Sequence, residues 1–147
     1  MPDQCLTFLK LGGSLITDKD QPETALIEQI DDLLTQIAEW RLANPSQRLL
    51  LGHGSGSFGH HVATQYGTRQ GFHGPEDILG FQQVWYSARK LNQIIIEQAQ
   101  LLNLPLIAFP PSACITAAEG LIREWNLRPL FRDRKSTRLN SSHRIRS

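Results

Sequence analysis

A glycine-rich stretch that directly follows a short apolar run constrains this chain more than any other feature. The run is Leu49–Leu51, and the glycines that follow are Gly52, Gly54, Gly56 and Gly59. Glycine lets the backbone approach a ligand closely, and the first N–H groups of a helix point toward negative charge. A buried strand that leads into this turn, and then into a helix over Val62–Tyr66, predicts an anion site beside His60 and His61.

The same arrangement occurs near the N-terminus. Phe8–Leu11 is apolar except for Lys10, and the turn Gly12-Gly13-Ser14 follows at once. A lysine in a buried strand is costly unless its ammonium reaches an anion; alternatively, Lys10 lies on an edge strand with its ammonium in solvent. If the two strands are parallel neighbours, both turns meet at one sheet edge. Two adjacent anion sites suggest a reaction between two phosphates.

Apolar periodicity predicts an α/β chain. The expected strands are Leu6–Leu11, Arg48–Leu51 and Leu106–Phe109, the first of them buried, and the expected helices are Thr24–Leu42, Pro75 to about Leu102, and Asn126–Phe131. Pro22 and Glu23 suit the first turn of the first helix. Ala113–Ala117 and Leu121–Glu124 predict a β-hairpin. The first strand, helix and second strand make one right-handed crossover with a parallel pair.

The long helix after Pro75 carries an apolar stripe that we expect to be mostly core. Its members are Phe81, Val84, Trp85, Ala88, Leu91, Ile95 and Leu102. We expect its first two turns to lie close to the second glycine turn. We therefore expect Phe81, Val84 and Trp85 to wall an apolar pocket for a substrate tail.

Composition and charge exclude several classes of protein. Of the 15 Lys and Arg and 14 Asp and Glu residues, six basic and one acidic lie in Arg132–Ser147, so the rest is mildly acidic. That balance argues against a nucleic-acid partner. Without an apolar run of ~20 residues or a signal-like start, we expect a cytoplasmic protein that does not contact membranes. Cys5 and Cys114 lack metal-ligand spacing, so we expect free thiols and no metal site.

Two nucleotide-binding patterns are incomplete. Gly54–Gly59 matches G-x-G-x-x-G, but the acidic residue at a dinucleotide-like distance, Asp77, falls at a helix start after Pro75 rather than at a strand end. The lysine that follows the glycines of a P-loop is also missing. We therefore reject both assignments.

Residues 132–147 form a basic, aperiodic tail that offers almost nothing to bury, so we expect it to be disordered. Lys135–Ser147 also resembles translated sequencing-adapter read-through, in which case the natural protein diverges near Arg132. A basic tail that binds nucleic acid is the alternative. The expected organisation is one domain part, residues 1–131, and this tail.

The two glycine turns together resemble isopentenyl phosphate kinases of the amino-acid-kinase superfamily. The matching segments are Lys10–Lys19 and His53–His60, and the likeness extends through Pro110-Pro111-Ser112 to about Phe131. The resemblance implies a three-layer α/β/α sandwich with a mainly parallel sheet. It also implies transfer of the ATP γ-phosphoryl group to isopentenyl phosphate, with Mg²⁺ carried by ATP, and a homodimer when full length.

The resemblance also implies roles for individual residues. Lys10 and the turn Gly12-Gly13-Ser14 would hold the ATP phosphates, and Gly56 also counts among the ATP-binding residues. Lys19 would stabilise charge on the transferring group; taken alone it would be a surface lysine. The acceptor phosphate would meet Gly54, Ser55, Gly56, Gly59 and His60, with Val84 near its tail. His60 would be catalytic with Lys19; otherwise it is a helix-start histidine facing solvent.

Members of this family are much longer, with a C-terminal half that binds adenine. We therefore expect the present chain to be a poor kinase or inactive, with an exposed sheet edge that favours aggregation. One alternative is a sibling kinase that acts on another phosphate or a phosphonate. A second is a non-catalytic anion-binding fragment.

Overall fold

A computed structural model describes residues 6–71, 73–75, 77–118, 121–126 and 128. The chain divides into two compact units, residues 1–108 and 109–147, which are described separately. The tail 132–147 and nearly all of the helix predicted at Asn126–Phe131 lie outside the described residues.

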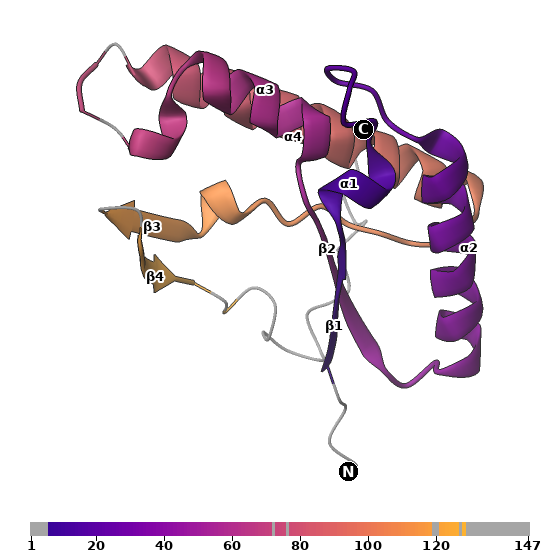
Figure 1. The fold of residues 1–147 in the computed structure, drawn as a ribbon. Coiled ribbons are helices and arrows are strands. Elements are labelled where there is room, and N and C mark those ends of the chain that lie inside the picture. The colour runs from indigo at the N-terminus through magenta and orange to yellow at the C-terminus, as the bar shows by residue number, and fades with distance from the viewer. Residues whose placement is uncertain (1–5, 72, 76, 119–120, 127, 129–147) are drawn as a thin grey trace, which may run out of the picture. The chain divides into compact units, whose positions relative to one another are not determined.

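The first unit is built on one parallel strand pair, β1 (Leu6–Leu11) and β2 (Arg48–His53). The short α1 (Gly13–Ile16) follows β1, and α2 (Ile27–Ala43) provides the crossover to β2. After β2 come α3 (Gly56–Gln65), a 3₁₀ turn at Thr68–Gln70, and the long α4 (Asp77–Leu101) (Figure 1). The predicted α/β class and parallel pair are confirmed.

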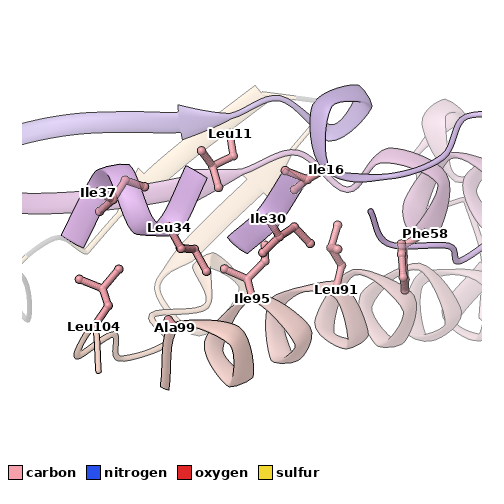
Figure 2. Close-up of a cluster of buried hydrophobic side chains, with 10 residues drawn as sticks. All are labelled: Leu11, Ile16, Ile30, Leu34, Ile37, Phe58, Leu91, Ile95, Ala99 and Leu104. Carbon is pink, nitrogen blue, oxygen red and sulfur yellow. The ribbon is translucent and has the colours of Figure 1, made fainter. Parts of the chain in front are cut away.

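The hydrophobic core lies between the helices and the strand pair. Ile30, Leu34 and Ile37 line one face of α2, and they pack with Leu91, Ile95 and Ala99 of α4 (Figure 2). Leu11, Ile16, Phe58 and Leu104 complete the cluster. Spacings of four and three residues on α2, and of four residues on α4, explain why these faces were recognisable as core.

Three predicted boundaries in this unit are wrong. Helix α2 begins at Ile27, not Thr24, because Leu26 N–H donates to Ile16 O and Asp18 N–H donates to Thr24 O, at 2.9 Å each. These bonds hold residues 17–25 in a hairpin-like loop, so Pro22 and Glu23 lie in a turn. Strand β2 extends to His53, and α3 begins at Gly56, so His60 lies within it.

Two predictions about burial and pairing also fail. Leu106–Phe109 is not a strand, because no other described segment pairs with its peptide groups. Phe8 of β1 is 67% exposed, since β2 is the only described strand beside it. Parallel strands are normally covered on both faces, so this apolar surface is unusual.

The second unit contains a short antiparallel hairpin. After a 3₁₀ turn at Pro111–Ala113, β3 (Ile115–Ala118) pairs with β4 (Leu121–Trp125), which confirms the predicted hairpin with shifted bounds. Asn126 N–H donates to Cys114 O at 2.8 Å and prolongs the pairing. The Cys114 thiol is free, as expected, and Cys5 lies outside the described residues.

Candidate functional site

The ends of β1 and β2 bring the two glycine turns together. In the parallel register Lys10 lies opposite Gly52 and Leu11 opposite His53. Gly54 N–H then donates to Leu11 O at 2.9 Å, which ties the second turn to the end of the first strand. Both turns leave the sheet at the same edge, where α1 and α3 begin (Figure 1). The predicted adjacency of the two turns is confirmed.

The backbones of the two turns touch directly. A Cβ added at Gly13 would lie 2.5 Å from Gly56 N and 2.8 Å from Gly56 Cα, and one added at Gly54 would lie 2.7 Å from Gly13 N. Real Cβ atoms do not approach backbone so closely. Only glycine fits at these positions, so the turns form one continuous surface of peptide groups.

Thr17 links the two turns by hydrogen bonds, a role that the sequence did not predict. Its side chain is buried, and its hydroxyl donates to Gly13 O at 2.8 Å while accepting from Ser57 N–H at 3.0 Å. Gly56 has φ +48°, and a Cβ there would lie 2.0 Å from Thr17 Oγ1. The Ser57 hydroxyl is buried and has no partner within the described part of the chain. No local pattern marks Thr17 for this role.

His53 joins the second turn to α4, a contact that the sequence also did not predict. Its Nε2 lies 3.0 Å from the side-chain amide nitrogen of Asn92, and its Nδ1 lies 3.0 Å from Gly54 O. Both ring nitrogens are thus engaged, one by the backbone of the turn and the other by a side chain of α4. His53 therefore supports the turn instead of facing a ligand.

The three predicted cationic or catalytic side chains are exposed. Lys10 is the penultimate residue of β1, Lys19 lies in the loop between α1 and α2, and His60 lies in the second turn of α3. None of the three side chains makes a hydrogen bond or ion pair with another described residue. The structure brings together the backbones of the two glycine turns, and it leaves these three side chains free to contact a ligand. Their assigned roles stay predictions.

The apolar stripe of α4 is only partly core. The buried positions are Gly80, Ser87, Leu91, Ile95 and Ala99, whereas Phe81 and Trp85 are 58% and 43% exposed. A Cβ at Gly80 would lie 2.7 Å from the Tyr66 Cβ, so the end of α3 packs against Gly80 and turns this face of the helix inward. Val84 is half-buried. The residues expected to wall the tail pocket are therefore exposed or half-buried on α4, and the pocket stays a prediction.

Among the described residues, no group of three or more His, Cys, Asp or Glu side chains could hold a metal ion. Across the same residues, no helix combines the length and apolar character needed to cross a membrane.

Comparison with known proteins identifies relatives of the chain. The model of the Amino acid kinase family matches residues 6–145. The chain is 31% identical over 125 residues to an isopentenyl phosphate kinase of Methanocaldococcus jannaschii, covering 80% of this chain and 47% of that protein. It is 36% identical over 121 residues to one of Methanothermobacter thermautotrophicus, covering 80% and 44%. The chain thus spans about half the length of the curated relatives it matches.

Solved structures support the same relationship. A Thermoplasma acidophilum isopentenyl phosphate kinase product complex matches with TM-score 0.70 and 27% identity, over 87% of this chain and 50% of that one. Another isopentenyl phosphate kinase structure matches with TM-score 0.72 and 31% identity, over 86% and 52%. These matches confirm the predicted fold class, of which this chain contains part. The chain belongs to the amino acid kinase family.

Proposed function

We propose that this chain forms the acceptor-side half of a kinase that transfers the γ-phosphoryl group of ATP to isopentenyl phosphate. The observation that carries the proposal is the backbone contact of Gly13 with Gly54 and Gly56. Phosphoryl transfer requires two anions held in line, with positive charge fixed around them. Two turns in direct contact would hold donor and acceptor phosphates side by side. The named relatives, which include substrate and product complexes, support this choice of substrate.

The donor side consists of the turn after β1. The first N–H groups of α1 have no partner inside the helix, and Lys10 lies three residues before its start, next to the last residue of β1. We assign Lys10, Gly12, Gly13, Ser14 and Gly56 to the ATP phosphates. The tight glycine contact leaves no Cβ over these peptide groups, which suits a phosphate ligand. Mg²⁺ would arrive with ATP.

The acceptor side consists of the turn after β2 and the start of α3. Gly54 and Ser55 would present peptide N–H groups, and His60 would donate to the acceptor phosphate. Gly59 acts indirectly, because a Cβ there would lie 2.6 Å from the Ser55 Cβ and push the turn open. The buried, unpartnered Ser57 hydroxyl is a further polar group beside this turn. Lys19 would stabilise charge on the transferring group, and Val84 would line the tail pocket.

The remaining parts of the proposal concern the whole protein. We place the end of the acceptor-side half near residue 131. The complete protein would be a cytoplasmic homodimer with small-molecule substrates.

A full-length chimera tests the activity. Residues 1–131 are joined to the C-terminal half of the Methanocaldococcus jannaschii relative, and isopentenyl diphosphate formation from ATP is measured. Lys19→Ala and His60→Ala should each reduce turnover by at least about tenfold, because each removes a group that stabilises transferring charge. His61→Ala, an exposed neighbour on α3, is the matched control and should stay near the unsubstituted rate.

Three outcomes would contradict the proposal in different ways. Near-normal turnover in Lys19→Ala or His60→Ala removes that residue from the mechanism. A chimera that prefers another phosphate or a phosphonate in a substrate panel indicates a sibling kinase. Calorimetry that detects isopentenyl phosphate binding to the 147-residue chain, beside a folded chimera without turnover, indicates a non-catalytic anion-binding fragment.

A further inference from the structure

We propose that Glu23 is a positioning residue, which clamps the loop that carries Lys19 onto the middle of α4. The inference rests on the proposed function, since Lys19 matters only if phosphoryl groups are transferred. Lys19 itself has no described partner, so something else must hold its loop. Glu23, four residues further along, is the described loop residue whose side chain bonds to α4.

The clamp uses both oxygens of the Glu23 carboxylate. Oε1 accepts a hydrogen bond from Ser87 Oγ, and Oε2 lies 2.7 Å from Lys90 Nζ. These partners are 64 and 67 residues away in the sequence. Ser87 and Lys90 are three positions apart on α4, so they share one face of the helix. Ser87 is 3% exposed, so its hydroxyl is a buried donor that needs this acceptor.

The backbone at Glu23 supports the same conclusion. Its φ is +50°, in the left-handed region that side-chain-bearing residues rarely adopt. Such a conformation persists where surrounding contacts hold it. The main-chain bonds at Asp18, Thr24 and Leu26 close the base of the loop, but they join the loop only to itself and to its flanking residues, and not to α4. The carboxylate is therefore the side-chain contact that fixes the turn to α4.

Glu23 is an ionised acceptor in this clamp. The hydrogen bond from Lys90, and then the one from Ser87, lower the pKa of this carboxyl below its ordinary value of 4.5. The group is therefore ionised at neutral pH. Both partners then donate to a charged acceptor, which gives stronger hydrogen bonds than neutral pairs.

Helix α4 consequently holds both sides of the candidate site. Ser87 and Lys90 hold the Lys19 loop, and Asn92, two residues further on, holds His53 at the base of the acceptor turn. One continuous helix thus sets the separation between Lys19 and the acceptor turn. Loss of the contact between α4 and Glu23 should impair the phosphoryl-transfer step. Loss of the contact between Asn92 and His53 should impair acceptor binding.

Kinetics of the chimera test this division. Glu23→Gln and Glu23→Gly should each lower kcat by at least about fivefold and leave the KM for isopentenyl phosphate within about twofold. Glu23→Gly also removes the strain of a side chain in the left-handed backbone region. If kcat falls in both variants, the lost carboxylate, and not the backbone strain, is the cause. Lys90→Arg should retain activity and Lys90→Met should lose it. Glu39→Gln, an exposed glutamate on α2, is the control. Asn92→Ala should instead raise the KM for isopentenyl phosphate and change kcat less.

Hydrogen exchange of the 147-residue chain provides a readout independent of activity. Glu23→Gln should speed amide exchange in residues 18–26 and leave the core of α2 unchanged. Unchanged exchange in this loop would overturn the clamp. Faster exchange with an unchanged kcat would overturn its positioning role and leave the proposed function standing. An inactive unsubstituted chimera would refute the proposed function, and the catalytic purpose of the clamp with it.

Discussion

Substitution of Gly13 by alanine should destabilise this protein far more than the same change at its neighbour Gly12. The added Cβ at Gly13 would lie 2.5 Å from Gly56 N, which is 0.9 Å short of the 3.4 Å where ordinary contact begins. Its neighbours are backbone atoms of the other turn, so no side chain can rotate away. The two turns must separate.

The size of the effect follows from what that separation breaks. Overpacking a tight site costs about 1–3 kcal/mol. Moving the second turn also strains two hydrogen bonds, Gly54 N–H to Leu11 O and Ser57 N–H to Thr17 Oγ1, worth about 1 kcal/mol each. We expect a loss of about 3–5 kcal/mol, a large share of the ~5–15 kcal/mol typical of folded domains. At about 4 °C per kcal/mol, Tm should fall by roughly 12 °C or more.

Urea and thermal unfolding followed by circular dichroism measure this loss. Gly12→Ala is the matched control, because Gly12 has ordinary extended backbone and a Cβ there would meet nothing closer than 4.0 Å. Its stability should stay within about 0.5 kcal/mol of the unsubstituted chain or rise slightly. Equal effects at the two positions, or a Gly13→Ala loss below about 1 kcal/mol, would refute the interlocked turns.

Three further predictions concern single contacts. Thr17→Val should lower the free energy of unfolding by about 1–3 kcal/mol in urea titrations, because a buried N–H loses its acceptor, whereas Thr17→Ser should keep most of that stability. Gly59→Ala should be destabilising alone and much less so with Ser55→Gly, since the added Cβ would clash with the Ser55 side chain; a double-mutant cycle with no coupling would contradict this. The pKa of Glu23 is lowered on folding, so its contribution is present above pH 4.5 and is lost as pH falls through the folded value. The stability difference between the unsubstituted chain and Glu23→Gln should therefore be constant near neutral pH and shrink in acid, and a difference that persists at pH 2 would contradict the assignment.

Local sequence patterns were sufficient for much of the fold. The apolar spacing on α2 and α4 identified two long helices, and apolar runs that end in glycine identified β1 and β2. These sequence patterns predict the elements correctly because each depends on residues within a few positions of one another. The start of α2 was misplaced by three residues, since the hairpin-like bonds of Asp18 and Leu26 override the helix-start signal of Pro22.

For the candidate site, the sequence alone was enough to identify the two turns and to predict that they share a sheet edge. Glycine spacing carries that information, because closely spaced glycines after an apolar run indicate a turn that brings backbone close to another group. What needed the tertiary structure was how the turns are held. Thr17 reaches Ser57 across 40 residues, His53 reaches Asn92 across 39, and Glu23 reaches Ser87 across 64. Polar partners this far apart are chosen by how the helices dock, and the docking of Tyr66 against Gly80 also decides which face of α4 is buried.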